Sequence, residues 1–121
     1  MDNNTCGIIR TYHFNGKLKE EYFQNNGLKE GIYKSFHQNG EPFKEIEYFN
    51  GVRHGKTKLY RQNKLYYEVD NVNGKLHGKY IQYDANGKVV LITNYVDGQI
   101  GEQTMQLNGF SVTKSWLLTS S

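Results

Sequence analysis

Residues 31–40 read Gly-Ile-Tyr-Lys-Ser-Phe-His-Gln-Asn-Gly, and residues 78–87 read Gly-Lys-Tyr-Ile-Gln-Tyr-Asp-Ala-Asn-Gly. Both segments open and close with glycine, and the same spacing returns along the whole chain. The opening glycines recur at intervals of 24, 24, 23 and 23 residues, at Gly7, Gly31, Gly55, Gly78 and Gly101. A fixed period of this length is typical of a repeat architecture, in which each unit packs on the unit before it.

Asn-Gly dipeptides divide the repeats into short segments. Asn-Gly is the strongest short-range signal for a β-hairpin, because a type I′ turn requires positive φ at both central residues. The chain has seven Asn-Gly pairs, and Asp97-Gly98 is an eighth turn of the same kind. The predicted turn glycines are Gly16, Gly27, Gly40, Gly51, Gly74, Gly87, Gly98 and Gly109.

Lys64 stands where the period places a turn glycine. Two outcomes are open at this position. Lys64 takes a left-handed conformation with strain on the order of 1 kcal/mol, or Asn63 adopts a different turn type and relieves it. In either case the period continues, so we interpret the substitution as a tolerated lapse.

The segments between the turns have the length and composition of strands. They are rich in Tyr, Phe, Ile and Val, which favour extended structure. The predicted fold is all-β: an elongated, single-layer antiparallel meander of about nine or ten strands, built from stacked β-hairpins and open at both ends. We divide the chain into an N-terminal tail (1–6), a repeat array of about four and a half units (7–109) and a C-terminal segment (110–121). The last segment is expected to be a capping strand or short helix, or else an exposed patch for a partner.

Composition narrows the class of protein. The formal net charge of +3 is weaker than the dense basic stripe of most nucleic-acid binders, so no nucleic-acid partner is predicted. Cys6 is the only cysteine, which excludes an internal disulfide. No signal-peptide core is present, and the longest aliphatic run, Val89–Ile92, is far too short for a membrane span. We therefore expect a soluble protein of the cytoplasm.

The glycine-framed segments quoted above, together with the linkers Tyr48-Phe-Asn-Gly51 and Tyr95-Val-Asp-Gly98, resemble the MORN repeat (membrane occupation and recognition nexus). The form is similar to the variant repeats common in bacteria and large DNA viruses, and the resemblance runs from about Gly7 to Gly109. It implies an elongated, twisted sheet of hairpins. It also implies a role in protein–protein scaffolding or, less securely, in binding acidic phospholipids.

One row of positions is the candidate binding face. The fifth residue after the opening glycine is aromatic in the first four units, and alternation places it on the same face as the third, which is basic in the first three units. The candidate residues are Arg10, Tyr12, Lys34, Phe36, Lys58, Tyr60 and Tyr83. The cations could hold phosphates or carboxylates, or they could simply keep the sheet soluble, with acidic neighbours such as Glu20, Glu45 and Glu47 neutralising them. If internal packing consumes the aromatic row, the opposite face with Tyr33, Thr57 and Tyr80 becomes the binding surface.

No constellation for catalysis or metal binding emerges. His54 and His77 occupy one repeat position, as His13 and His37 do, but equivalent residues lie two strands apart, about 10 Å, too far to share a zinc ion. Because a flat sheet offers no deep cleft, we predict no enzyme, no metal and no cofactor. The predicted function is non-catalytic binding and scaffolding of another protein. The alternatives are peripheral binding to anionic phospholipid membranes through the basic and aromatic face, and edge-to-edge self-association.

Overall fold

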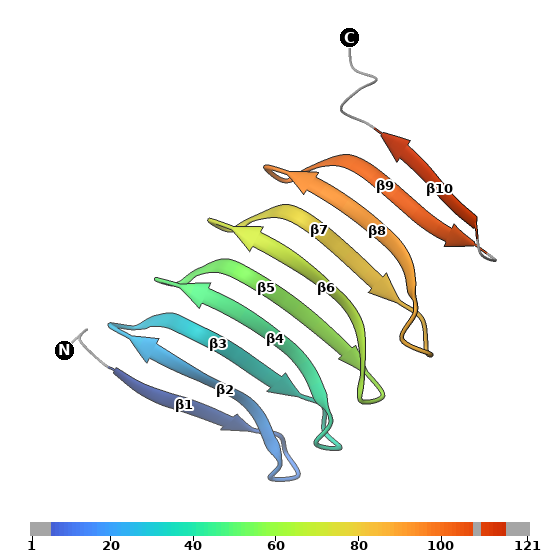
Figure 1. Ribbon diagram of the computed structural model, residues 1–121. Coiled ribbons are helices and arrows are strands. Elements are labelled where there is room, and N and C mark those ends of the chain that lie inside the picture. Colours follow the sequence, from blue (N-terminus) through green and yellow to red (C-terminus); the bar gives the residue numbers. More distant parts are fainter. Residues whose placement is uncertain (1–5, 108–109, 116–121) are drawn as a thin grey trace.

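The computed structural model of the protein describes residues 6–107 and 110–115, which form one antiparallel sheet of ten strands (Figure 1). The strands lie side by side in chain order, so each one pairs only with its neighbours in sequence. Their bounds are β1 Cys6–Tyr12, β2 Leu18–Asn25, β3 Leu28–Phe36, β4 Pro42–Phe49, β5 Val52–Arg61, β6 Lys64–Val72, β7 Lys75–Tyr83, β8 Val89–Val96, β9 Gln99–Leu107 and β10 Phe110–Ser115. The predicted all-β meander of stacked hairpins, open at both ends, is confirmed.

Two-residue turns connect the strands along one edge of the sheet, the upper left in Figure 1, which we call the short-turn edge. The first residue of each turn has φ between 50° and 54°, and the glycine has φ between 81° and 85°. These values confirm the predicted turns with positive φ at both positions. The four turns are Asn26-Gly27, Asn50-Gly51, Asn73-Gly74 and Asp97-Gly98.

The opposite edge, which we call the long-loop edge, is built differently. Five residues lie between β1 and β2, between β3 and β4, and between β7 and β8. The first and last of the five are joined by a backbone hydrogen bond, such as that from His13 N to Lys17 O, 2.8 Å, so that each pair encloses a three-residue loop. In these loops only Gly16, Gly40 and Gly87 have positive φ, while their asparagines do not. The type I′ prediction is therefore wrong for these Asn-Gly pairs. The pair that contains Gly109 lies outside the described residues.

The loop between β5 and β6 is shorter than the three loops described beside it. Only Gln62 and Asn63 lie between the strands, with φ of 51° and 64°, and Arg61 pairs directly with Lys64. Lys64 is therefore a strand residue, and the expectation of a left-handed lysine is wrong. The alternative, a different turn type at Asn63, is confirmed. One residue has been removed from this loop, and the strands on either side continue in register.

Three of the five opening glycines lie in β-bulges with positive φ rather than in turns. Gly31, Gly55 and Gly78 have φ of 81°, 106° and 91°, and the strand register shifts beside each of them. At Gly55 a Cβ atom would lie 2.8 Å from Cδ of Glu47, whose carboxylate accepts a hydrogen bond from Lys56 N. Only glycine combines this backbone with this close approach. The regular spacing of these glycines in the sequence therefore reflects a β-bulge that recurs from one repeat to the next.

The sheet buries side chains on one face, which we call the core face. Cross-strand partners place one row of residues there, and Ile46, Val69 and Thr93 in this row are 3%, 5% and 2% exposed. The row runs Tyr33, Ile46, Thr57, Val69, Tyr80 and Thr93. Tyr33, Thr57 and Tyr80 therefore share a face, as expected. The other face carries charged residues and is called the charged face.

Hydrogen bonds tie successive hairpins together at both edges. On the short-turn edge, the amides of Gly51, Gly74 and Gly98 donate to backbone carbonyls of the preceding unit at 2.8–2.9 Å. On the long-loop edge side chains form these links instead, such as Asn15 Nδ2, which donates to the carbonyl of Gln38 at 2.8 Å. Among the described residues the short-turn edge therefore has a main-chain link between units, whereas the long-loop edge is linked by side chains, which can vary.

The two ends of the array are strands. β1 begins at Cys6, and β10 pairs with β9 through residues 110–115. Phe110 and Val112 in β10 are exposed. Trp116, Leu117 and Leu118, which belong to the expected capping segment, lie outside the described residues.

Candidate functional site

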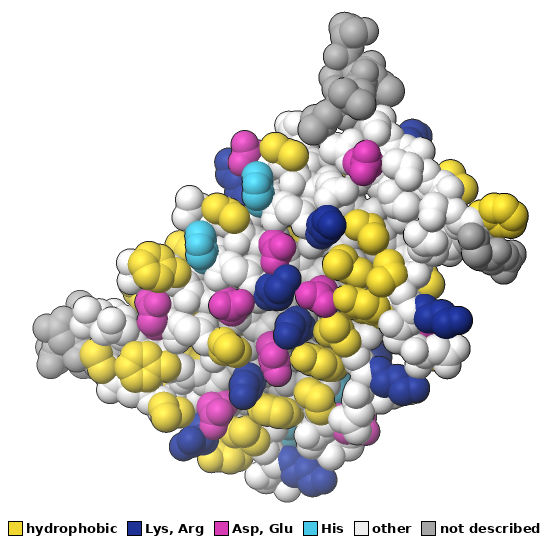
Figure 2. Space-filling model, in the orientation of Figure 1, with side chains coloured by type: hydrophobic (Ala, Val, Ile, Leu, Met, Phe, Trp, Pro, Cys, Tyr) yellow, Lys and Arg dark blue, Asp and Glu magenta, His cyan; other side chains and the backbone are white. Residues whose placement is uncertain are grey.

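A row of alternating charges crosses six strands on the charged face. Each residue lies directly opposite the next in the strand register, and the signs alternate along the row. Figure 2 shows basic and acidic side chains alternating along a diagonal of this face. We call this row the charge ladder: Arg10, Glu21, Lys34, Glu45, Lys58 and Glu68.

Several members of the charge ladder are fixed by hydrogen bonds. Arg10 Nε lies 2.7 Å from Glu21 Oε2, and this hydrogen bond, with the charge of Glu21, raises the pKa of Arg10. Burial works against ionisation of Glu68, but hydrogen bonds from Tyr83 and Lys56 lower its pKa overall. The Tyr83 hydroxyl donates to Glu68 Oε2 at 2.7 Å. Hydrogen bonds thus hold the two ends of the ladder, and side chains of opposite formal charge lie opposite each other along its whole length.

Of the three glutamates that were predicted to lie beside the basic row, the structure places one there. Glu45 lies in the charge ladder between Lys34 and Lys58. Glu20 lies on the core face instead, where it accepts hydrogen bonds from Thr11 and Tyr33. Glu47 binds the backbone beside the bulge at Gly55. Glu21 and Glu68 were not predicted as partners of the cations. They could have been found by following the alternation of side chains along each strand, once the bulges that shift the register were recognised.

The aromatic members of the candidate face lie beside the charge ladder, toward the long-loop edge. Tyr12 is 59% exposed, whereas Phe36, Tyr60 and Tyr83 are half-buried. Burial, together with the charges of Glu45 and Glu68, raises the pKa of Tyr60. The structure thus brings the predicted basic and aromatic residues to one face. It also surrounds the cations with carboxylates and packs most of the aromatic rings.

The core face carries a cation enclosed by tyrosines. Nζ of Lys29 lies 5.2, 4.9 and 5.3 Å from the ring centres of Tyr22, Tyr33 and Tyr48. Burial and a hydrogen bond to Glu20 raise the pKa of Tyr33, and that bond lowers the pKa of Glu20. Because the lysine belongs to the chain itself, this cluster is already satisfied and serves the packing of the first two units.

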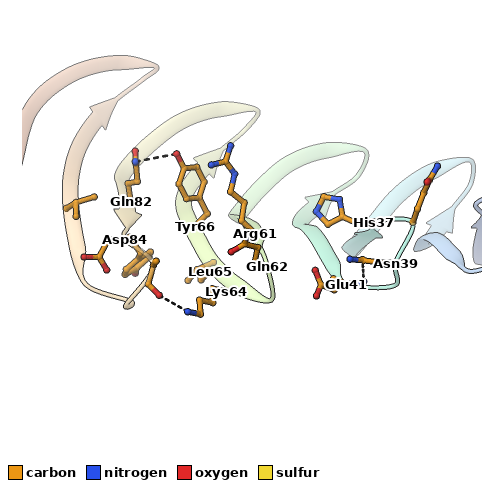
Figure 3. A pocket seen from close by; sticks show the side chains of 14 residues that line it. His37, Asn39, Glu41, Arg61, Gln62, Lys64, Leu65, Tyr66, Gln82 and Asp84 are labelled. Atoms are coloured by element: carbon orange, nitrogen blue, oxygen red, sulfur yellow. Dashed lines mark hydrogen bonds between the residues drawn. The ribbon is translucent and has the colours of Figure 1, made fainter.

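A groove of about 910 Å³ opens at the long-loop edge. Its lining comes from three consecutive loops, those between β3 and β4, β5 and β6, and β7 and β8. Figure 3 shows Arg61, Tyr66 and Gln82 along its wall, with Glu41 and Lys64 nearer the turns. The guanidinium of Arg61 lies 4.3 Å from the ring centre of Tyr66, and Gln82 Nε2 donates to the Tyr66 hydroxyl at 3.5 Å.

The groove lies where the short loop of Gln62 and Asn63 is flanked by two longer loops. A second hollow, partly lined by the first two three-residue loops, has a volume of about 440 Å³, roughly half as large. The removal of one residue thus coincides with the larger hollow. This open groove was not expected from a flat sheet, for which the sequence predicted no deep cleft. The missing glycine at position 64 was the signal in the sequence, and it was interpreted as a lapse.

The histidines link neighbouring hairpins. Nδ1 of His54 accepts a hydrogen bond from Asn73 N at 3.3 Å, and Nδ1 of His77 accepts one from Asp97 N at 3.4 Å. Glu30, at the equivalent position, accepts one from Asn50 N at 2.9 Å. Within residues 6–107 and 110–115 no three His, Cys, Asp or Glu side chains are grouped so that they could hold a metal ion.

A search of the described residues for membrane spans finds no helix with the length and apolar character that crossing a bilayer would need.

Comparison with known proteins gives a family and one similar structure. The model of the family described as "MORN repeat variant" matches residues 5–26, 29–50 and 76–97, more than half of the chain. The structure titled "Crystal Structure of TarM" is similar with a TM-score of 0.50 and 15% identity, over 86% of this chain and 18% of the other. This likeness concerns the fold, and the chain spans less than a fifth of that structure's length. No curated protein matches.

MORN repeats are non-catalytic modules that are generally associated with binding to proteins or membranes. The unmatched stretch, residues 51–75, contains the shortened loop between β5 and β6. The repeat period, the ten-stranded meander and the matched segments agree, and the chain belongs to the MORN repeat variant family.

Proposed function

We propose that the chain is a non-catalytic protein-binding module that acts as a scaffold. The observation that carries the choice of a protein over a membrane is the charge ladder, because each of its cations has a carboxylate directly opposite it. Firm attachment to an anionic membrane needs several uncompensated cations, at roughly 1 kcal/mol each. In this chain the predicted basic row is matched by an equal row of Glu21, Glu45 and Glu68.

The groove at the long-loop edge is a second, independent observation that supports a protein-binding function. It combines an aromatic ring, aliphatic side chains and amide groups in one hollow, with Tyr66, Leu65 and Gln82 among its lining. Protein-binding surfaces use such a mixture, in which aromatic residues and arginine contribute most to affinity. Self-association through the edge strands β1 and β10 is the remaining alternative, and the experiment must therefore also detect dimers.

Co-sedimentation with vesicles of phosphatidylcholine and phosphatidic acid tests the proposal. We expect the wild-type chain to remain in the supernatant at low and at physiological salt. The variant Glu21→Gln/Glu45→Gln removes two carboxylates of the charge ladder and should bind the vesicles at low salt, because it leaves Lys34 with no opposing charge. Wild-type binding that is lost in Lys34→Glu/Lys58→Glu would instead establish the membrane function.

The positive arm is a selection of random displayed peptides on the immobilised chain. Peptides that bind the chain in solution support a protein-binding function, whatever site they use. Sedimentation equilibrium of the same preparation reports self-association. A chain that forms dimers and binds no peptide would contradict the proposed function and favour the edge-to-edge alternative.

A further inference from the structure

We infer that the groove at the long-loop edge holds an extended segment of a partner protein, with an Asp or Glu side chain of that segment paired to Arg61. This inference rests on the proposed protein-binding function and names both its site and the chemistry of its partner. It starts from the short loop of Gln62 and Asn63, which lies at the centre of the groove.

Arg61 is presented for pairing with a carboxylate. Its side chain is exposed, and its guanidinium lies 4.3 Å from the ring centre of Tyr66. Stacking against an aromatic ring restricts a guanidinium but leaves its N–H edge able to form two parallel hydrogen bonds. Among the described residues no salt bridge involves Arg61. The arginine is therefore ordered and retains its charge-pairing capacity.

The other charged groups of the groove are already engaged. Glu41 accepts a hydrogen bond from Asn63 Nδ2 at 3.1 Å, and Lys64 Nζ donates to the carbonyl of Ala85 at 2.9 Å. Asp84 accepts hydrogen bonds from the backbone amides of Lys88 and Asn86, which lower its pKa. These hydrogen bonds leave the three charges in place but occupy the atoms that carry them, so among the described lining residues Arg61 is the charged side chain that still has no hydrogen-bond partner, and its complement is an anion.

The size of the groove favours a peptide segment over a small ion. A volume of about 910 Å³ is near the upper end of ligand sites, and far exceeds one carboxylate or phosphate group. Leu65, Val90 and the ring of Tyr66 supply apolar surface, while Gln62 and Gln82 supply amides for a peptide backbone. We therefore expect an acidic residue flanked by apolar residues in an extended conformation.

The loop at 38–40, Gln-Asn-Gly, supplies a matched variant for the short loop, which reads Gln-Asn at 62–63. Insertion of one glycine after Asn63 restores the three-residue loop that the neighbouring units use. The longer loop should occupy the opening and reduce peptide binding, while the sheet keeps its fold because the same loop already occurs between β3 and β4. Circular dichroism and thermal unfolding check the fold of this variant.

The experiment measures the affinity of peptides selected on the wild-type chain, by fluorescence polarisation. We expect these peptides to share an Asp or Glu, and replacement of that residue by Asn or Gln to weaken binding roughly tenfold or more. Arg61→Gln should weaken binding to the same degree, and the two changes together should cost no more than either alone. Arg53→Gln, at the other end of the same strand and outside this groove, should leave the affinity unchanged.

Peptides without an acidic residue, or peptides that bind Arg61→Gln and the glycine insertion as tightly as the wild type, would overturn the inference. In that case the protein-binding function would stand at another site. If no peptide binds the wild-type chain, the groove is not a peptide site, and the vesicle measurement then decides the proposed function separately.

Discussion

The two edges of the sheet use the same Asn-Gly dipeptide for different purposes. On the short-turn edge both residues have positive φ, and Gly51, Gly74 and Gly98 donate their amides to the preceding unit. On the long-loop edge only the glycine has positive φ, and Oδ1 of Asn39 accepts a hydrogen bond from Glu41 N instead. The loop there has lost one residue between β5 and β6, whereas the four short turns are uniform.

This difference shows where the repeat tolerates variation. A main-chain hydrogen bond between units demands a constant turn, because a change in its length would displace the donor. A side-chain link can be lost or replaced at one unit without a change in strand register. The short-turn edge therefore maintains the repeat, and the long-loop edge provides the groove.

The largest effect should come from the bulge glycine with the closest side-chain contact, Gly55. Gly55→Ala places a Cβ atom 2.8 Å from Cδ of Glu47, at φ of 106°. We expect a loss of about 2–3 kcal/mol in the free energy of unfolding, from backbone strain and displacement of the carboxylate. Urea unfolding measures it.

Gly87→Ala is the matched control on the long-loop edge. Its φ of 82° is also positive, but no atom lies within 4 Å of the added Cβ. It should cost about 1 kcal/mol from strain alone. Equal losses for the two alanines would show that contact with Glu47 plays no part.

A pair of Asn→Gly substitutions should separate the two edges by the size of the stability loss. Asn73 has φ of 52°, which glycine adopts freely, so Asn73→Gly should be nearly neutral. Asn39→Gly removes the acceptor for Glu41 N and adds freedom to the unfolded chain, at a cost of about 1 kcal/mol. Thermal unfolding of the two variants compares them. A greater loss at Asn73 would contradict the division of the edges.

A smaller effect should follow from the acceptor that joins two short turns. His54→Ala removes the Nδ1 atom that accepts from Asn73 N, at a cost of about 0.5 kcal/mol because the bond is long. His54→Glu should restore stability, since Glu30 performs the same role for Asn50. Denaturant midpoints measured on the three proteins test this order. If the glutamate is as damaging as the alanine, the position does not act as an acceptor.

The smallest effect should be local and dependent on pH. Backbone hydrogen bonds from Lys88 and Asn86 lower the pKa of Asp84 from its ordinary value of 3.8. A lowered carboxyl pKa in the folded state stabilises the loop above pH 3.8, and this contribution is lost as pH falls through the folded pKa. The protection factors of the amides of residues 86–88, which allow for the intrinsic slowing of exchange at low pH, should fall in this range. Asp84→Asn should remove the pH dependence, and an unchanged profile in this variant would disprove the role of Asp84.

Much of the fold could be predicted from the glycine period and the composition of the segments between the turns. The opening glycines fix the repeat, and the order of the hairpins follows from their short connections. The physical role of the opening glycines was harder to predict from the sequence. Gly31 and Gly55 look like turn residues in sequence, because the positive φ that a bulge requires is the same as that of a turn.

The candidate site was only partly predictable for a related reason. Lys34 and Phe36 could be placed on one face by alternation, but which glutamate opposes a lysine depends on the register across two bulges. A shift of one residue moves a side chain to the other face. Glu20 was therefore expected beside the cations and lies instead against Tyr33. Arg61 and Tyr66 were missed because their proximity depends on the length of the loop between them.

The neighbour-only pairing of the strands has a mechanical consequence. The first and last strands lie at opposite ends of the sheet, and every strand runs across the line that joins them (Figure 1). Tension applied between those ends loads the hydrogen bonds of one strand pair at a time, as in a zipper, rather than all pairs together as in shear. We expect the array to lengthen in small steps at low force, one hairpin after another, and to reform in the reverse order when the tension is released.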